Sequence, residues 1–425
     1  MNYFDMDKEA LIELRSELQR EYDFIKKKGI RLDMSRGKPS REQVEISMPM
    51  LNYNGVDAYI TKNGEDCCNY GFFDGIKEMK ELFASILDVE AENIFVGGNS
   101  SLNMMFDTIS GYMTNGVCGG QPWAKQQKIK FLCPSPGYDR HFAILEYFKI
   151  EPIVVPMTKV GPDMNMVENL VKEDETIKGI WCVPKYSNPQ GITYTSDTVK
   201  RFAKLKPKAN DFRIFWDNAY AVHFLGEEDD YLLSLYKECE KNGTEDLPIM
   251  FTSMSKITIP GAGVAALAAS KKNLGDIKAR YKIQTIGYDK VNQLRHVRFL
   301  RDYKGIVEHM KKHREFLKPK FDVVINSLQH EFYQNNVISF TKPNGGYFVS
   351  VDVLDNCADK VINLCQDAGL VLTQAGATYP HNKNVRNNNI RLAPTYPTIE
   401  DLTEAMNLFC ICVKIVTIDE LLQAV

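Results

Sequence analysis

The sequence lacks the features that mark membrane, nucleic-acid-binding and disulfide-rich proteins. No stretch approaches the roughly 20 apolar residues of a membrane span, and the N-terminus is charged and helix-periodic rather than an apolar signal segment. The net charge of −3 provides no basic field for nucleic acid. The ten cysteines include no C-x-x-C pair, so neither a disulfide framework nor a metal site is expected. These absences predict a cytoplasmic protein without nucleic-acid, membrane or metal partners.

The pattern of apolar runs predicts an α/β fold. A chain of 425 residues is too long for one core of ordinary size, so we expect a large domain and a smaller one. Short apolar runs bounded by Gly, Pro, Asn or Asp alternate with helical patterns, which is typical of a mainly parallel sheet between layers of helices. We expect strands at 94–96, 129–133, 152–156, 179–183, 213–217, 249–252 and 264–269, and helices at 101–113, 138–148 and 196–206.

The pattern changes after about residue 285 and predicts a second, smaller α/β domain. Residues 291–317 are typical of a long charged helix with a break near Gly305. The expected elements outside the large sheet are an amphipathic helix at 7–28, strands near 337–341 and 346–353, and helices near 357–368 and 399–414.

Reactive side chains gather where the predicted parallel strands end. Ligands bind at this edge of an open parallel sheet because loops and helix N-termini converge there. Four polar loops follow predicted strands: Gly97-Gly98-Asn99-Ser100-Ser101, Ser187-Asn188-Pro189-Gln190-Gly191, Asp217-Asn218-Ala219-Tyr220 and Ser253-Met254-Ser255-Lys256. Each loop alone has an ordinary structural interpretation, but their common position favours one shared site.

The chemistry of these loops is suited to an anion and a reactive amine. Gly97 and Gly98 precede a helix N-terminus, which is a ready phosphate site, although an ordinary glycine turn with a helix cap explains the same residues. Asp217 ends an apolar strand, where a carboxylate needs a partner such as a protonated ring nitrogen or a backbone cap. Lys256 is either a desolvated amine that forms Schiff bases or a solvated surface charge. The Asn188 amide can donate a hydrogen bond into the site.

Taken in order along the chain, these loops resemble the motifs of the fold-type I pyridoxal-phosphate (PLP) enzymes, the aspartate aminotransferase superfamily. The resemblance covers roughly residues 30–415 and includes Arg391 in the segment IRLAPTYP. LDMSRGKPS, NYGFFDG, CPSPGYDRHF and KITIPGAGV resemble the subgroup called type Ic aspartate aminotransferases, or MocR-like aminotransferases. The resemblance implies an aspartate-aminotransferase-like fold, with a large PLP-binding domain at 48–317 and a small domain made of 1–47 and 318–425.

The resemblance also assigns roles around the cofactor ring. It implies that Lys256 forms the Schiff base with PLP and then acts as general base and acid. Asp217 would face the pyridine nitrogen and keep it protonated. Asn188 and Tyr220 would hydrogen-bond the phenolic oxygen of the ring. Tyr138 would stack on the ring, with a half-buried turn residue as the alternative interpretation.

For the cofactor phosphate, the resemblance implies four residues of the same chain: Asn99, Ser100, Ser253 and Ser255. Tyr70 resembles the tyrosine that reaches the phosphate from a partner subunit, which implies a homodimer with shared active sites. Many relatives carry an Arg eight residues after the lysine, where this chain has Val264. The group that replaces this phosphate-binding Arg stays open.

The substrate is expected to bind through arginine. Arg391 resembles the arginine that clamps the substrate α-carboxylate with a two-point contact, beside Asn188. Arg36, in Ser-Arg-Gly-Lys-Pro, is the candidate for the distal carboxylate of an acidic substrate, with a structural salt bridge as the alternative. The expected reaction moves the amino group of an L-amino acid, aspartate, to a 2-oxo acid, 2-oxoglutarate.

Two other functions stay open. One is another PLP reaction on the same scaffold, such as alanine or aromatic transamination or β-elimination. The other is a non-catalytic PLP-sensing regulator, against which the short segment before LDMSRGKPS argues because it leaves no room for a DNA-binding module.

His309 and His313 are four residues apart, a helical spacing that can bind a metal. No third ligand lies nearby, and the surrounding sequence is rich in lysine. We therefore expect these two histidines to lie on a solvated helix face.

Overall fold

The centre of the computed structural model, which describes residues 3–53, 59–333 and 336–424, is an eight-stranded mixed sheet ordered β2-β9-β8-β7-β6-β3-β4-β5. Strands β8, β7, β6, β3 and β4 are parallel neighbours, whereas β9 is antiparallel to β2 and β8, and β5 is antiparallel to β4. The strands are β2 (Ile94–Val96), β3 (Lys130–Ser135), β4 (Glu151–Thr158), β5 (Gly161–Pro162), β6 (Ile177–Cys182), β7 (Arg213–Asp217), β8 (Pro248–Ser253) and β9 (Ala265–Ala269). The predicted mainly parallel sheet is confirmed, because every strand expected for it is present.

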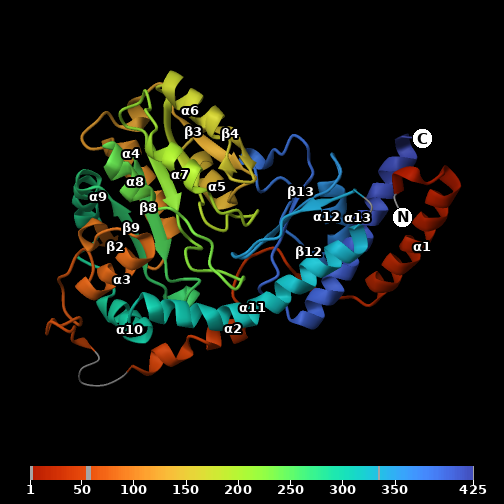
Figure 1. The fold of residues 1–425 in the computed structure, drawn as a ribbon, viewed down its shortest axis with the longest axis horizontal. Coiled ribbons are helices and arrows are strands. Elements are labelled where there is room, and N and C mark those ends of the chain that lie inside the picture. The colour runs from red at the N-terminus through yellow and green to blue at the C-terminus, as the bar shows by residue number, and fades with distance from the viewer. Residues whose placement is uncertain (1–2, 54–58, 334–335, 425) are drawn as a thin grey trace.

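Helices cover both faces of this sheet (Figure 1). Alternate strand residues point to opposite faces, so Phe95 packs with one layer while Ile94 and Val96 pack with the other. The first layer contains α4 (Ser101–Asn115), α5 (Asp139–Tyr147) and α9 (Lys271–Gln284). The second contains α3 (Lys77–Leu87), α6 (Met164–Glu173), α7 (Ser196–Ala203) and α8 (Leu235–Asn242). The strands are therefore buried on both faces, which explains their continuous apolar runs.

A smaller antiparallel sheet, ordered β10-β11-β13, lies beside the large one (Figure 1). Two further short strands, β1 and β12, pair in parallel with each other. The first and last long helices, α1 and α13, pack side by side at the far end of the molecule. The elements are α1 (Lys8–Lys27), β1 (Leu32–Asp33), β10 (Ser339–Phe340), β11 (Val349–Asp352), α12 (Ala358–Asp367), β12 (Leu370–Val371), β13 (Asn389–Leu392) and α13 (Ile399–Ala424). The domain limits 48–317, 1–47 and 318–425 stay a prediction.

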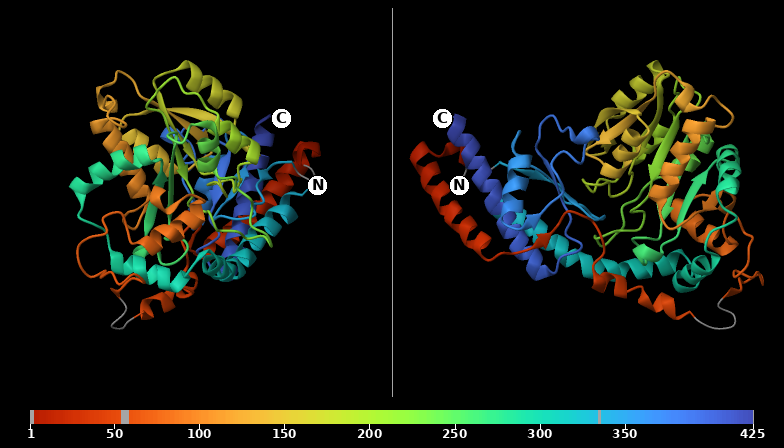
Figure 2. Two further views of the ribbon diagram at one scale, coloured as in Figure 1. Left: turned by 60° about the vertical axis from the view of Figure 1, so that its left-hand side comes forward. Right: turned by 180° about the vertical axis from the view of Figure 1, so that it is seen from behind.

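Two helices, α10 (Lys290–Leu300) and α11 (Tyr303–Phe332), replace the single long helix, and α11 runs from the large sheet to the small one (Figure 2). The break, expected near Gly305, comes at Arg301, whose φ is 66°. Asp302 caps the new helix by accepting a hydrogen bond from the Gly305 amide at 2.8 Å. Gly305 is needed for a different reason: a Cβ there would lie 1.9 Å from the Leu300 carbonyl oxygen.

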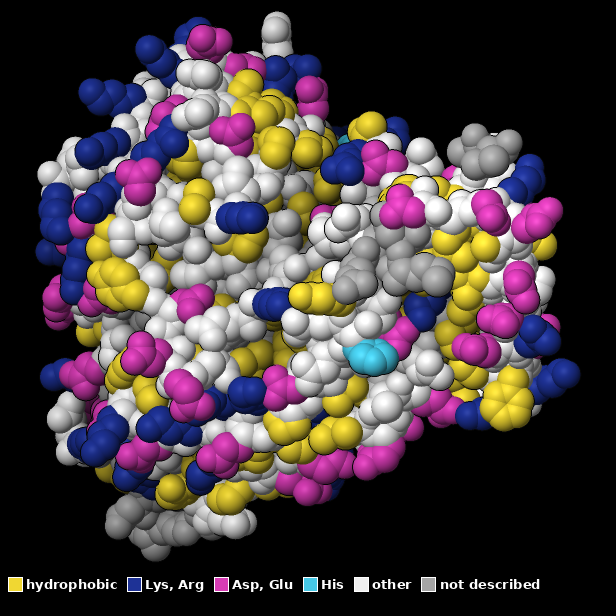
Figure 3. Space-filling model, turned by 45° about the vertical axis from the view of Figure 1, so that its right-hand side comes forward, with side chains coloured by type: hydrophobic (Ala, Val, Ile, Leu, Met, Phe, Trp, Pro, Cys, Tyr) yellow, Lys and Arg dark blue, Asp and Glu magenta, His cyan; other side chains and the backbone are white. Residues whose placement is uncertain are grey.

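The remaining helices are short, and none of the described helices is long and apolar enough to cross a membrane. They are α2 (Arg41–Glu45) and the 3-10 helices Tyr3–Asp5, Met48–Asn52, Ala91–Asn93, Trp123–Lys125, Pro260–Ala262 and Pro380–Asn382. Over the face in Figure 3, positive and negative side chains are interspersed, in keeping with the small net charge.

Candidate active site

A cavity of about 800 Å³ lies where the parallel strands of the large sheet end. The segment after β1, the residue just before β11, β12 with the loop after it, and β13 supply its other wall, so residues far apart in sequence meet there. Ten of the residues predicted from the sequence line it: Arg36, Ser100, Tyr138, Asn188, Asp217, Tyr220, Ser253, Ser255, Lys256 and Arg391. Their individual roles stay predictions.

A buried carboxylate forms one wall of the cavity. Asp217, at the end of β7, is 3% exposed. Its Oδ2 accepts a hydrogen bond from His141 Nε2 at 3.0 Å, and the His141 ring stacks on Trp181 at 4.3 Å between ring centroids. Its Oδ1 has no hydrogen-bond partner among the described residues. Because an unpaired buried carboxylate oxygen is costly, Asp217 is suited to a cationic or N–H group of a ligand.

The amine of Lys256 faces the buried ring of Tyr220, in a cavity that the half-buried Tyr138 also lines. Its Nζ lies 4.7 Å from the centre of the Tyr220 ring. Burial raises the pKa of Tyr138 to about 12 and raises that of Tyr220 well above its usual value. Both hydroxyls therefore stay protonated at neutral pH and can donate hydrogen bonds into the cavity.

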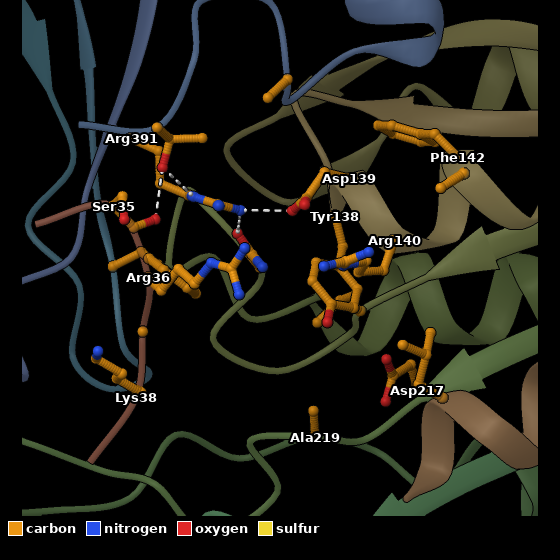
Figure 4. Close-up of a pocket in the computed structure, with 18 of the residues that line it drawn as sticks. Ser35, Arg36, Lys38, Tyr138, Asp139, Arg140, Phe142, Asp217, Ala219 and Arg391 are labelled. Atoms are coloured by element: carbon orange, nitrogen blue, oxygen red, sulfur yellow. Dashed lines mark hydrogen bonds and ion pairs between the residues drawn. The ribbon is translucent and has the colours of Figure 1, made fainter. Parts of the chain in front are cut away.

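Arg391, on β13, provides a positive charge at the cavity wall opposite Asp217 (Figure 4). Its Nη1 donates to Asp139 Oδ1 at 2.9 Å and to Asn188 Oδ1 at 3.2 Å, and its Nε donates to Thr373 Oγ1 at 3.3 Å. The guanidinium carbon lies 4.8 Å from the centre of the Phe348 ring. These contacts fix the orientation of a guanidinium that a carboxylate can bind.

Four serines and a helix N-terminus form a third part of the wall. Ser100 and Ser101 begin α4, and the Ser100 side chain makes no capping hydrogen bond. Ser253 and Ser255 line the cavity beside Lys256. Free N–H groups at a helix N-terminus together with hydroxyl donors suit a phosphate.

Comparison with known proteins agrees with this geometry. The family model described as aspartate amino-transferase matches residues 6–424. The chain belongs to the aspartate aminotransferase family. It is 42% identical to an aspartate aminotransferase of Corynebacterium glutamicum, over 96% of this chain and 95% of that protein.

Solved structures agree with the assignment. An aspartate transaminase of Corynebacterium glutamicum superposes with a TM-score of 0.96 at 40% identity, covering 99% of each chain. The α-aminoadipate aminotransferase LysN of Thermus thermophilus, solved with N-(5'-phosphopyridoxyl)-L-leucine, has a TM-score of 0.74 at 18% identity and covers 94% of this chain and 95% of that one. The second likeness concerns the fold alone. The enzyme is thus an aminotransferase of fold type I.

Two of the predicted cofactor ligands do not line the cavity. Asn99 is exposed, and its backbone carbonyl accepts a hydrogen bond from the Ser255 hydroxyl at 2.9 Å. Tyr70 is 80% exposed and lies outside the cavity of the single chain. Val264 is buried and likewise does not line it.

The structure brings in residues that the sequence reasoning missed. Asp139, Arg140 and His141 follow Tyr138 directly, so the motif CPSPGYDRHF already contained them. Lys38 enters the wall from the same segment as Arg36. Both motifs contain these residues, but the sequence did not indicate which of their side chains would face the cavity.

The expectation of a solvated face for His309 and His313 is wrong. The two histidines are 5% and 2% exposed, and their Nε2 atoms lie 3.1 Å apart. His309 Nε2 also lies 2.9 Å from the Ile257 carbonyl oxygen. This face of α11 packs under the loop that carries Lys256. The two histidines are therefore buried, although the lysine-rich sequence around them suggested a solvated face.

The same buried network reaches the lysine from the N-terminal segment. Gln43 Nε2 lies 3.0 Å from His313 Nδ1 and donates to the Tyr347 hydroxyl at 2.8 Å. The Tyr347 hydroxyl in turn donates to the Lys256 carbonyl at 3.4 Å. Polar contacts therefore connect α2 with the backbone at Lys256.

Proposed function

We propose that this aminotransferase uses PLP to transfer the amino group of aspartate to 2-oxoglutarate. The observation that carries the proposal is the unpartnered, buried Asp217 Oδ1 in the same cavity as the Lys256 amine. The protonated pyridine nitrogen of PLP supplies the cation that this oxygen needs. The serines at the start of α4 and beside Lys256 supply donors for the phosphate.

Bound PLP acts as an electron sink that stabilises the carbanion left when a proton leaves the substrate Cα. The residues of the chain bind, orient and move protons. Asp217, held by His141, keeps the ring nitrogen protonated. With the cofactor bound, Tyr220 and Asn188 would donate hydrogen bonds to its phenolic oxygen, and the Lys256 amine would take up and return the Cα proton.

An acidic substrate is supported by the excess of basic over acidic side chains in the cavity wall, where Asp139, Glu146 and Asp217 are the acidic ones. Arg36, Lys38 and Arg140 line it in addition to Arg391. Arg36 and Arg391 point toward the same part of the cavity (Figure 4). Arg391 binds the α-carboxylate, and Arg36 binds the distal carboxylate.

The cofactor claim is tested by absorbance. The purified enzyme is expected to have a band at roughly 360–430 nm that borohydride removes. The band should be absent from Lys256→Ala and unchanged in Lys272→Ala, a lysine exposed on α9. A Lys256→Ala protein with the same borohydride-sensitive band would refute the assignment.

The substrate claim is tested by steady-state kinetics with aspartate, alanine, an aromatic amino acid and cystathionine as donors. Aspartate should be preferred, and Arg36→Gln should raise the KM for aspartate more than that for alanine. Arg41→Gln removes an exposed arginine five residues away and should change neither. Failure to convert aspartate would sink the substrate claim and leave the cofactor claim intact.

We further propose a homodimer in the cytoplasm, in which Tyr70 reaches the phosphate of the partner. The exposed position of Tyr70, outside the cavity, supports the dimer, and the ten free cysteines support the location. Tyr70→Ala and Lys256→Ala should each be inactive, yet mixing the two proteins should restore activity because the hybrid contains one intact site. No recovery after subunit exchange would contradict the shared site.

A further inference from the structure

Asp139 provides a second carboxylate at the substrate clamp. It is the first residue of α5, and its Oδ1 lies 2.9 Å from Arg391 Nη1. The side chains of Arg391 and Asp139 are 6% and 34% exposed, respectively. The ion pair, drawn in Figure 4, therefore lies at the cavity wall, with Asp139 the more exposed of its two partners.

The Arg391 guanidinium has few donors left. Of its five N–H groups, Thr373 takes the one on Nε, and Asn188 and Asp139 take those on Nη1. Only Nη2 has no hydrogen-bond partner among the described residues. A carboxylate that binds two different nitrogens of Arg391 must therefore displace one of these partners.

Asp139 is the partner that can leave. Asn188 is 4% exposed and fixed in the wall, and Thr373 is tied to the Ser35 carbonyl by a hydrogen bond of 2.7 Å. Asp139 is more exposed than Asn188 and carries the only negative charge among the three contacts. An incoming carboxylate also repels it, because like charges in a partly buried site oppose each other.

Asp139 is not needed to orient Arg391. Asn188, Thr373 and the Phe348 ring hold the guanidinium on three sides. The principal effect of Asp139 is on charge, since it neutralises the clamp. Without it, the positive charge of Arg391 would be available to a ligand.

We propose that Asp139 occupies part of the carboxylate site of Arg391 as an internal competitor and thereby sets the affinity for substrate. This inference rests on the proposed role of Arg391 as the α-carboxylate clamp. Weaker ground-state binding raises KM without slowing the chemical step, because uniform binding changes KM and not kcat, and it lets the 2-oxo acid product leave.

The test is the affinity of the holoenzyme for succinate, a dicarboxylate without an amino group, measured by calorimetry. Asp139→Asn keeps an acceptor for Nη1 and removes the charge, so its Kd for succinate should fall at least tenfold. Asp139→Ala removes both the acceptor and the charge and should bind succinate more tightly as well. Asp197→Asn makes the same charge change in the first turn of α7 and should bind as the wild type does.

Kinetics should agree with the binding data: Asp139→Asn should lower the KM for aspartate more than it changes kcat. Equal or weaker succinate binding by both Asp139 variants, or no binding by any of the proteins, would overturn the proposal. Tighter succinate binding without any conversion of aspartate would instead support the competitor role and refute the proposed substrate.

Discussion

Acidification is predicted to destabilise the enzyme through its buried histidines. Burial lowers the pKa of His296 and His309 from 6.5 to about 4, and that of His223 and His313 to about 3. The folded chain therefore keeps these imidazoles neutral at a pH where the unfolded chain protonates them. Their contribution to stability is complete above pH 6.5 and is lost as the pH falls toward the folded pKa values.

The size of this loss of stability follows from the pKa of one histidine in the unfolded chain and its pKa in the folded chain. At pH 5 an unfolded histidine is almost fully protonated, whereas folded His309, with a pKa of about 4, is mostly neutral. The difference corresponds to a loss of roughly 2 kcal/mol in the free energy of unfolding between pH 8 and pH 5. The other three histidines add to this loss, although contacting residues such as His309 and His313 do not contribute independently.

Urea unfolding at pH 8 and pH 5, followed by tryptophan fluorescence, measures this loss. All three tryptophans are buried and report on the fold. In His309→Gln the amide can still donate to the Ile257 carbonyl, but no group titrates there. The variant should therefore lose roughly 2 kcal/mol less than the wild type between the two pH values.

The matched control is His330→Gln, which removes a histidine whose side chain is 86% exposed, on the same helix. It should lose as much stability as the wild type. An equal loss in wild type and His309→Gln would refute the argument, because it would mean that burial of this imidazole is not coupled to protonation.

Three further changes have expected outcomes. Gly179→Ala should destabilise the fold by about 1–3 kcal/mol in urea unfolding, because a Cβ there lies 2.2 Å from the Phe131 ring. Phe202→Ala should cost about 3–5 kcal/mol in the same assay, since the removed ring is fully buried. His141→Phe should keep the aromatic packing but leave both Asp217 oxygens unpartnered, and PLP affinity, measured by absorbance titration, should fall roughly tenfold. An unchanged free energy of unfolding in either of the first two variants, or an unchanged PLP affinity in the third, would contradict the contact on which that prediction rests.

The large sheet could be predicted from the sequence because its strands are buried on both faces. Strands buried in this way consist of continuous apolar runs. Strand β13 was missed: NIRL is short and contains Arg391, so it has no such run. The break before α11 was expected near Gly305, and the Asp302 cap fixes its position. A glycine was the obvious breaker in the sequence, but the cap and the close approach of Leu300 become visible only in three dimensions.

By itself, the sequence determined the α/β architecture, the edge of the sheet where the site lies and most of the side chains that line it. These follow from local patterns: apolar runs, glycine turns and polar residues at strand ends. Only the tertiary structure decided which charged and polar side chains contact one another and which are buried. Asp139 and Arg391 are 252 residues apart, and His309 and His313 are buried because another segment covers their helix. Such contacts depend on how distant elements pack, which no local pattern encodes.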